Sequence, residues 1–433
     1  MSVSTGLFLG LDVVLVVAGV WGCCIRGGRA RVDHVMLFSL GFTLYWILPV
    51  AAGLTGIYRD QSWMSLWYGL FDAIAARRLA EYFGVCAASY VAFVAGSLVA
   101  PAFLAPPRRP AGWGFDRRLG ALFLLPLLAA ASIFAYEVRA ELFHGYAGID
   151  ENFGFRGSFT AASLFLLALA FVDTAKRHDR LGPGATMRAL VVTPCFGAYF
   201  VFALLVLSMG GRLYFMTSLL MLLAYATVFI APVRLATFGG SLAGIAALSG
   251  VIGLFRLGAG ASTAAVLINL LSEFFFTSFS LLNYLSAHQL AAVHAPVFLA
   301  SDFTNLVPLF LFPQKAAFAI PPEARGYQVF SPFGALNSFF SFQINFGVIG
   351  TLVVLFAFGA WLSALRVNAQ SALARVVYVM VSGWLTFSFF RDPFSISVVK
   401  NIFEFSIVVP TLLVVGLYVL TLAGRPARVG SLA

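Results

Sequence analysis

Long apolar stretches, each ended by charged residues or by Pro and Gly clusters, recur along the whole chain. About 20 apolar residues suffice for a helix to cross a bilayer. The pattern predicts eleven such spans, at residues 6–25, 35–56, 83–105, 119–137, 158–175, 189–209, 213–232, 238–255, 339–365, 373–390 and 402–423. Two further segments, 264–285 and 294–313, are long enough to span but more polar. We therefore expect an all-α polytopic integral membrane protein of about 11–13 transmembrane helices, with residues 1–433 forming a single integral membrane domain.

The composition excludes several other classes of protein. Of the 433 residues, 61% are hydrophobic and only 10% are charged, whereas about a quarter of the residues in soluble domains are charged. A cytoplasmic enzyme, a nucleic-acid-binding protein and a disordered scaffold are all inconsistent with these values. The four cysteines, Cys23, Cys24, Cys86 and Cys195, lie inside apolar runs, so we expect small core side chains there and no disulfides.

The net charge of +10 is unevenly distributed between the two alternating sets of loops. One set, formed by residues 26–34, 106–118, 176–188, 233–237, 366–375 and 424–433, holds 16 Lys and Arg residues against four acids, counting Asp173 at the end of a span. The opposite set carries a slight negative charge. Because Lys and Arg concentrate in cytoplasmic loops, the basic set is expected inside. The C-terminus is then inside, and the N-terminus is outside for eleven spans or inside if one mixed segment also spans.

Two segments on the expected external side have mixed polarity. In residues 57–82, apolar side chains recur at helical spacing among charged ones, which predicts an external amphipathic helix lying in the membrane interface. Residues 256–340 are too apolar for a free loop and too polar for a lipid-facing helix, so we expect a large external region of interfacial or re-entrant helices there. Ionisable residues at membrane depth are costly and commonly functional, so this region is expected to carry the active site.

Four arginines stand at the expected external ends of spans: Arg156, Arg212, Arg256 and Arg391. A guanidinium group binds phosphate through two parallel hydrogen bonds and keeps its charge at all relevant pH values. Any interfacial arginine can instead simply extend toward lipid headgroups. The functional interpretation is favoured most for Arg212, which follows two glycines, and for Arg391, which adjoins Asp392.

A lone carboxylate, Glu273, lies among apolar residues in the sequence LLSEFFF. It is a candidate general base, and pairing with an arginine for structural reasons is an equal alternative. Asp302 and Glu323 are weaker candidates, better explained as solvated loop charges. The histidines lack the spacing that zinc requires, so we expect neither a metal site nor a cofactor.

The order of these features resembles a known family. A span leads to Gly210, Gly211 and Arg212, and then come Arg256, a helix bearing Glu273, the segment VPLFLFPQK at 307–315 and the segment FGALNSFFSFQINFGVIGTLVVLFAFG at 333–359. Over residues 200–400 this is similar to bacterial O-antigen or oligosaccharide repeat-unit polymerases of the Wzy type, which are related to O-antigen ligases.

The resemblance implies a metal-independent membrane glycosyltransferase of GT-C-like architecture in the bacterial inner membrane, with its active site facing the periplasm. Such an enzyme of lipopolysaccharide and other polysaccharide biosynthesis would transfer a glycan from undecaprenyl pyrophosphate to the sugar end of an incoming undecaprenyl-pyrophosphate-linked repeat unit. The implied partners are these lipid-linked oligosaccharides, membrane lipid and a chain-length regulator protein, with no nucleic acid.

The same resemblance implies roles for individual residues. Arg212, Arg256 and Arg391 would hold the donor pyrophosphate, and Glu273 would accept the proton of the attacking hydroxyl. The remaining substrate-binding candidates are Arg156, Lys315, Arg325, Tyr327 and Asn337. Asn337 and Asn345 could equally cap helices.

Two alternatives remain. O-antigen ligases carry a His-Asn pair before the last loop-to-span transition, but the matching place here is Leu336-Asn337, which favours a polymerase and removes the obvious catalytic base. Flippases of the same pathways show two pseudo-repeated halves with buried charges in a central cavity. The unusual polarity of this chain is concentrated in one region instead.

Overall fold

The computed structural model describes residues 2–103, 153–178, 182–208, 211–257, 263–307, 311–318, 320–327, 335–369 and 371–412, with isolated positions at 124–139, 329 and 415–419. Helices make up nearly all the regular structure of these residues, and the only strands among them are three of two residues each. The described part of the chain is thus an all-α protein, as its hydrophobic pattern predicts.

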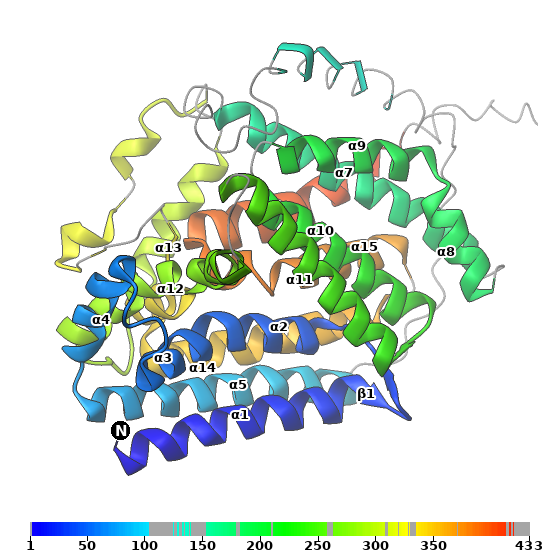
Figure 1. Ribbon diagram of the computed structural model, residues 1–433. Coiled ribbons are helices and arrows are strands. Elements are labelled where there is room, and N and C mark those ends of the chain that lie inside the picture. Colours follow the sequence, from blue (N-terminus) through cyan, green and yellow to red (C-terminus); the bar gives the residue numbers. More distant parts are fainter. Residues whose placement is uncertain are drawn as a thin grey trace, which may run out of the picture.

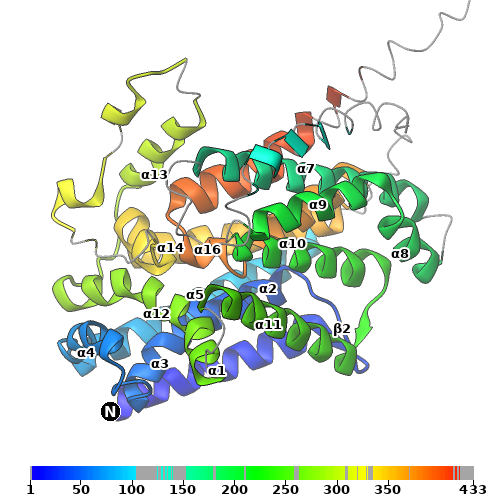
Figure 2. The same ribbon diagram turned by 45° about the horizontal axis from the view of Figure 1, so that its top comes forward.

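Four helical segments lie side by side in one layer (Figures 1 and 2). They are α1 (Val3–Cys24), α5 (Ala76–Phe103), α14 (Ser338–Val367) and the run of α2 (His34–Phe42), the π-helical turn η1 (Thr43–Ile47) and α3 (Leu48–Thr55). Glycines let α5 and α14 touch through their backbones: a Cβ atom on Gly96 would lie 2.0 Å from the carbonyl oxygen of Phe356. Close contact between small residues is a common way for membrane helices to pack.

A second group of helices lies above this layer in Figure 1. It comprises α7 (Phe153–His178), α8 (Pro183–Val191), α9 (Pro194–Ser208), α10 (Arg212–Tyr225) with the π-helical turn η4 (Ala226–Ile230), and α11 (Leu235–Leu257). Helix α15 (Ala372–Trp384) packs against two of them, α7 and α10. Pro194 starts α9 two residues after α8 ends, and the two helices meet at 59°. Proline cannot continue the hydrogen-bond ladder of the helix before it, which explains the bend.

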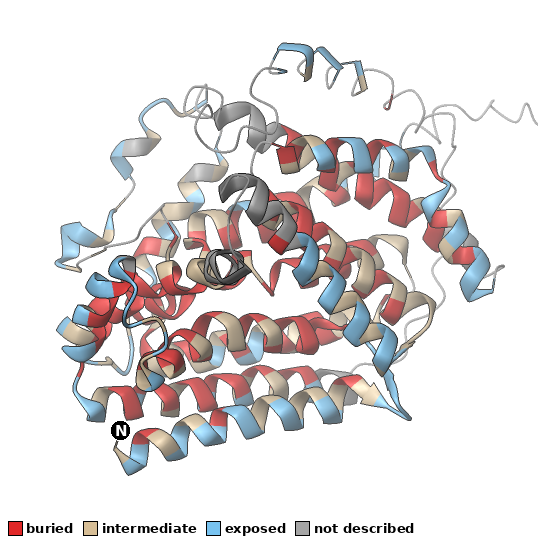
Figure 3. Cartoon of the chain, in the orientation of Figure 1, coloured by how far each residue is buried: buried red, intermediate tan, exposed pale blue. Residues whose placement is uncertain are grey.

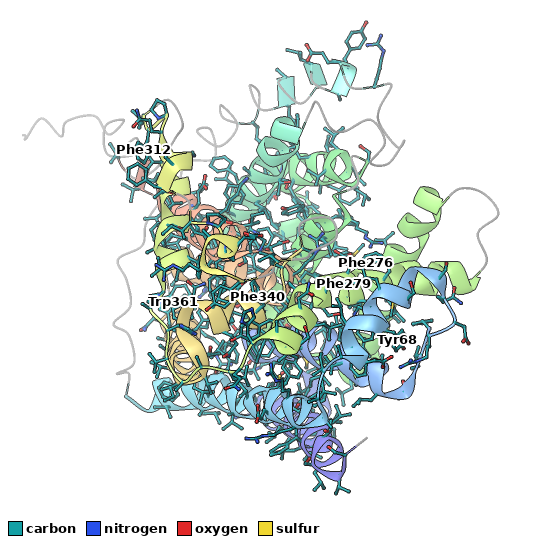
Figure 4. All side chains as sticks on the ribbon, turned by 90° about the vertical axis from the view of Figure 1, so that its left-hand side faces the viewer. Tyr68, Phe276, Phe279, Phe312, Phe340 and Trp361 are labelled. Atoms are coloured by element: carbon teal, nitrogen blue, oxygen red, sulfur yellow. The ribbon has the colours of Figure 1, made fainter. Side chains whose placement is uncertain are left out.

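The C-terminal third supplies both buried and peripheral elements. The buried ones are α12 (Thr263–Ala287), α15 (Ala372–Trp384), α16 (Ser388–Arg391) and the π-helical segment η9 (Ser395–Val408). The peripheral ones are α13 (Val297–Asp302) and the 3₁₀ turns η5 (Phe303–Leu306), η6 (Lys315–Phe318) and η7 (Pro322–Arg325). Figure 4 shows Phe279 of α12 and Phe340 of α14 in the packed interior, and Phe312 near the edge of the molecule.

Helix α14 contains a break. Gly347 has φ 66° and ψ −170°, a conformation that only glycine adopts readily. The N–H groups of Val348 and Ile349 are satisfied by the carbonyl oxygens of Ala291 and Ala292. The segment before α13 therefore docks where α14 changes direction.

The outward faces of the helices are apolar. On α1 the exposed side chains include Val3, Leu7, Leu11, Val14 and Trp21, which recur at helical spacing, and Figure 3 shows this helix with much of its length exposed. An apolar exterior suits a hydrocarbon solvent. The described part contains six helices long and apolar enough to cross a membrane, or seven if α8 and α9 form one bent span, so the protein is membrane-embedded.

The predicted number of spans is larger than this. Helices lie where spans were expected at 158–175, 238–255 and 373–390, but only their shorter portions Phe159–Ala175, Leu235–Leu248 and Ala372–Trp384 are apolar helices there. The expected span at 119–137 lies mostly outside the described residues. Because parts of α7 and α11 also fall outside the residues whose side chains are described, the predicted number of spans is neither confirmed nor contradicted.

The segment 57–82 is not one interfacial helix, so that prediction is wrong. It contains the 3₁₀ turn η2 (Ser62–Met64) and α4 (Ser65–Asp72), and its last residues already belong to α5. Trp67, Tyr68 and Phe71 are buried, and the indole N–H of Trp67 donates to Ser278 of α12. The apolar face of α4 thus packs against protein. The Arg59–Asp72 ion pair closes this segment into a compact loop.

The region 256–340, expected to consist of interfacial or re-entrant helices, includes one helix of the core. Its longest element, α12, packs against η1, α3, α4 and α14, and Phe279, Leu281 and Leu282 are almost fully buried. This helix belongs to the core of the molecule. The peripheral elements of the region start only at α13.

Candidate functional site: an arginine–carboxylate cluster

Three of the charged residues singled out in the sequence meet inside the helix bundle. Nη2 of Arg212 lies 2.9 Å from Oε2 of Glu273, and Nε of Arg391 lies 2.7 Å from Oε1 of the same carboxylate. Each carboxylate oxygen therefore faces a different guanidinium group. The side chains are only 10%, 14% and 22% exposed for Arg212, Glu273 and Arg391, so water screens these interactions weakly.

The cluster continues through polar residues of the C-terminal third. Nη1 of Arg391 lies 3.1 Å from Oδ1 of Asp392. The hydroxyl of Ser388 donates to Oδ2 of Asp392 and accepts from the amide of Asn401. Arg212, Glu273, Arg391 and Asp392, which we call the arginine–carboxylate cluster, carry no net charge when all are ionised.

Breaks in regular helix place these side chains. Arg212 is the first residue of α10 and follows Gly211, where a Cβ atom would lie 2.6 Å from the carbonyl oxygen of Val206. Arg391 ends the one-turn helix α16, and Pro393 prevents that helix from continuing. Glu273 instead sits within α12, on a face that also bears Thr277 and Ser280 at helical spacing.

The cluster lies well inside the bundle. We call one end of the bundle the basic end. It is the end at which the backbone N–H of Val32 donates to the hydroxyl of Thr227. Arg212 precedes Thr227 by 15 residues on α10 and η4, which corresponds to about 22 Å at 1.5 Å per residue. The cluster therefore lies toward the end of α10 that is remote from the basic end, buried among the helices.

Tyr45 is a functional candidate that the sequence did not reveal. It is fully buried, and its hydroxyl has no hydrogen-bond partner among the described residues. All four charged groups of the cluster lie within electrostatic reach of this hydroxyl, and its ring packs edge-on against Phe274, the neighbour of Glu273. Tyr45 belongs to the π-helical turn η1, and such turns occur often at functional sites. A tyrosine within an apolar run gives no signal in the sequence.

Two of the expected substrate-binding residues, Lys315 and Arg325, lie on the peripheral 3₁₀ turns, and Tyr327 follows η7. The Lys315 ammonium donates to the carbonyl oxygen of Val307. The guanidinium of Arg325 lies 5.8 Å from the centre of the Phe298 ring. The Tyr327 ring packs against Tyr284 and His288. None of these contacts involves the cluster.

Asn337 acts as a helix cap, one of the two roles considered for it. It is the N-cap of α14: its side-chain oxygen accepts from the N–H of Phe339, and its amide donates to the carbonyl oxygen of Tyr45. Asn345 is buried and joins α14 to α13, because its side-chain oxygen accepts from the N–H of Leu299. Asn337 thus helps to position Tyr45, which lies near the cluster.

The two remaining arginines are placed only by their backbones. Arg156 lies in the first turn of α7, and Arg256 lies in the last turn of α11. Their side chains lie outside the described part of the structure.

Other carboxylates outside the spans have different surroundings. Burial raises the pKa of Asp302 to about 6, although the backbone N–H of Ser395 donates to it and opposes this rise. The hydrogen bond from Arg59 lowers the pKa of Asp72. Within the described residues, no group of three or more His, Cys, Asp or Glu side chains is arranged to hold a metal ion.

Comparison of the chain with protein-family models, curated proteins and solved structures finds no match. The feature with the clearest chemical meaning is the arginine–carboxylate cluster, since paired guanidinium groups recognise anionic groups.

Proposed function

We propose that the protein is a membrane glycosyltransferase that polymerises lipid-linked oligosaccharide repeat units at the periplasmic face of a bacterial inner membrane. It would move a glycan from undecaprenyl pyrophosphate to the sugar end of an incoming undecaprenyl-pyrophosphate-linked unit. The observation that carries this proposal is the convergence of Arg212 and Arg391 on the single carboxylate of Glu273. The resemblance of residues 200–400 to repeat-unit polymerases supplies the substrate class.

In this proposal Glu273 occupies the place of the substrate anion in the resting protein. Its two oxygens hold both guanidinium groups in position, as two phosphate oxygens would. Pyrophosphate carries more charge than a carboxylate and so competes for these arginines. The start of α10 favours it further, because a helix N-terminus attracts anions and the N-cap residue Gly211 has no side chain to occupy this end.

Displacement of Glu273 would then start the reaction. The hydroxyl oxygen of the acceptor sugar attacks the anomeric carbon of the donor, and the bond from that carbon to the pyrophosphate oxygen breaks. The electron pair leaves with the pyrophosphate, whose developing charge Arg212 and Arg391 stabilise. The hydroxyl proton passes to the released carboxylate of Glu273, which acts as general base.

Further residues would contribute to binding. The hydroxyl of Tyr45 is positioned to hydrogen-bond the pyrophosphate or the attacking sugar, because it faces the cluster and has no partner among the described residues. Lys315, Arg325 and Tyr327, on the peripheral elements, would contact the acceptor unit. Arg156 and Arg256 would assist with the phosphates.

One observation favours a second candidate, a transporter of lipid-linked glycans. The cluster is enclosed among the helices of a membrane-embedded protein, and charged groups so placed also mark substrate pathways. A transporter requires the arginines for substrate binding but forms no glycosidic bond, so product formation separates the two functions.

The proposal is tested with purified protein in detergent and a short-chain pyrophosphate-linked repeat unit, with a ladder of longer glycans on a gel as readout. The wild type is expected to produce the ladder. Arg212→Lys and Arg391→Lys keep the charge but lose the paired donors, and we expect each to lower the rate by roughly 100-fold, the scale seen on removing one transition-state donor. Tyr45→Phe is expected to lower it less.

Matched controls separate chemistry from folding. Arg59→Lys alters an exposed, doubly hydrogen-bonded arginine outside the cluster and should leave the ladder unchanged. Each variant is compared with the wild type in melting temperature. Full activity in both cluster lysine variants would disprove the role of the arginines, and full activity in Glu273→Gln would remove the proposed base. A folded wild type that forms no ladder with several repeat units would favour the transporter.

A further inference from the structure

The basic end of the bundle carries an unusual small sheet. Strands β1 (Ile25–Arg26), β2 (Arg29–Ala30) and β3 (Val233–Arg234) pair antiparallel in the order β1–β2–β3. Gly27 and Gly28, with φ 55° and 70°, form the tight turn between the first two strands. The sheet thereby joins the end of α1 to the segment before α11.

The register of this sheet places three arginines in one row. Arg26 lies opposite Arg29, and Arg29 lies opposite Arg234. Directly paired residues share one face of a sheet with their Cβ atoms about 5 Å apart, and like charges so placed destabilise the pairing. All three side chains are exposed. The positive charges of this row repel one another when no ligand is bound. An anion that bridges the arginines would therefore stabilise the row.

Beside this row is a cavity of about 560 Å³ whose lining is strongly basic. Arg26, Arg29 and Arg31 come from the ribbon, Arg366 from the end of α14, and Arg375 from the start of α15. We call this cavity the basic pocket. Five guanidinium groups from three separate parts of the chain thus point to one space.

Few of these charges are neutralised by the protein. Arg366 pairs with Asp33 at 2.6 Å, and Nε of Arg375 donates to the carbonyl oxygen of Ala369. Within the part of the chain that the structure describes, Arg26, Arg29 and Arg31 have no carboxylate within ion-pair distance. The pocket therefore keeps a net charge of about +4 when every group in it and Asp33 are ionised.

The rest of the lining is apolar. It includes Phe229, Pro232, Val367 and Ala369. The pocket is located where α1 and α14 end and α15 begins, which for membrane-spanning helices is the level of the lipid headgroups. Basic pockets between helix ends at this level suit anionic lipid headgroups.

We propose that the basic pocket binds a phosphate group, and that the phosphate belongs to the headgroup of an anionic phospholipid. Arg26 and Arg29 would contact its oxygens through their paired N–H donors, and the apolar walls would contact the glycerol and the start of the acyl chains. This site is separate from the arginine–carboxylate cluster and does not depend on the proposed transferase function.

The test measures the melting temperature of the purified full-length protein in detergent. Added phosphatidylglycerol or cardiolipin is expected to raise it by at least about 3 °C, and phosphatidylcholine is not. In Arg26→Gln/Arg29→Gln this rise is expected to disappear, while the lipid-free melting temperature stays equal or increases because the repulsion across the ribbon is relieved. Inorganic phosphate and pyrophosphate at matched ionic strength form the second arm of the test.

Control variants show whether the lipid effect depends on Arg26 and Arg29 in particular. Arg59→Gln/Arg77→Gln removes two exposed arginines elsewhere and should keep the full lipid effect. Arg26→Lys/Arg29→Lys retains the charge and should show a smaller rise than the wild type, which provides a second readout if the glutamine variant does not fold. A rise with free phosphate that needs Arg26 and Arg29 would support the phosphate site but identify a soluble ligand. An equal lipid effect in wild type and Arg26→Gln/Arg29→Gln, or no effect of any phosphate compound, would overturn the proposal.

Discussion

The arginine–carboxylate cluster and the basic pocket use the same side chain in opposite ways. In the cluster, two buried guanidinium groups meet two carboxylates, and the charges cancel. In the pocket, five guanidinium groups share one carboxylate, and the ribbon arginines are exposed. One region is neutral and enclosed, and the other is cationic and open.

The difference follows from the cost of removing charge from water. A buried ion loses several kcal/mol of hydration, so it persists only beside a partner of opposite charge. Charges in contact with water carry a much smaller cost and can remain in excess. An anion therefore reaches the cluster only by replacing a carboxylate, whereas it can enter the pocket without displacing any group. We accordingly expect selective binding at the cluster and salt-sensitive binding at the pocket.

The largest expected effect follows from removing the central carboxylate. Glu273→Gln leaves Arg212 facing an uncharged amide in a buried site, and breaking a buried pair in this way costs about 3–5 kcal/mol. The free energy of unfolding, measured by denaturant titration in mixed micelles, should fall by this order. The control is Glu81→Gln, because Glu81 forms an exposed pair with Arg77 one helical turn away. Such pairs contribute about 0.3–0.5 kcal/mol.

A double variant tests whether Arg212 and Glu273 interact directly. When Arg212→Met is combined with Glu273→Gln, the remaining charges of the cluster are Arg391 and Asp392, which are paired with each other at 3.1 Å. Balance is restored, so the double variant should be more stable than Glu273→Gln alone, with a coupling energy of about 1–3 kcal/mol. Strict additivity of the two single changes would show that Arg212 and Glu273 do not interact in the membrane protein.

Only some of the residues of the cluster and of the pocket could be identified as site residues from the sequence. Arg212, Glu273 and Arg391 were identifiable because a charge among apolar residues is itself a signal. Their contact in the folded protein could not be predicted, because it depends on the ends of α10 and α16 reaching the middle of α12. Tyr45 could not be identified as a site residue from the sequence, because a tyrosine within an apolar span cannot be distinguished there from a residue that only packs.

The basic end shows the same limit. Arg26, Arg29 and Arg234 were counted only as evidence for orientation, and their alignment depends on pairing between strands far apart in the chain. The helical membrane class was predicted correctly from local hydropathy. The number of spans stays a prediction, because several expected spans lie partly outside the described residues. Long-range packing, which no local pattern encodes, decides where the site forms.

The next expected effect concerns Asp33, the one carboxylate at the basic pocket. Its side chain pairs with Arg366 and also caps α2 by accepting from the N–H groups of Val35 and Met36. In Asp33→Asn the cap can persist, because Asn is as good an N-cap as Asp, but the ion pair is lost. We expect a loss of about 1–2 kcal/mol in stability, together with tighter binding of anionic lipid because the pocket gains one net positive charge.

The control for this prediction is Asp72→Asn, which removes an exposed carboxylate from its pair with Arg59 and should alter neither stability nor lipid binding appreciably. Lipid binding is compared at low and high salt by the shift in melting temperature. Weaker lipid binding in Asp33→Asn than in the wild type would contradict the electrostatic account of the pocket.

The smallest expected effect concerns Asp302, a partly buried carboxylate that has no arginine partner among the described residues. Its pKa is raised to about 6 by burial. A raised pKa means that the folded protein holds the proton more tightly than the unfolded chain, so this contribution to stability is complete below about pH 4 and is lost as the pH rises through 6. The wild-type melting temperature should therefore decrease slightly from pH 5 to pH 7, and Asp302→Asn, which stays neutral, should lack that component. A steeper decrease in the variant than in the wild type would show that the hydrogen bond from the backbone N–H of Ser395, and not burial, dominates at this carboxylate.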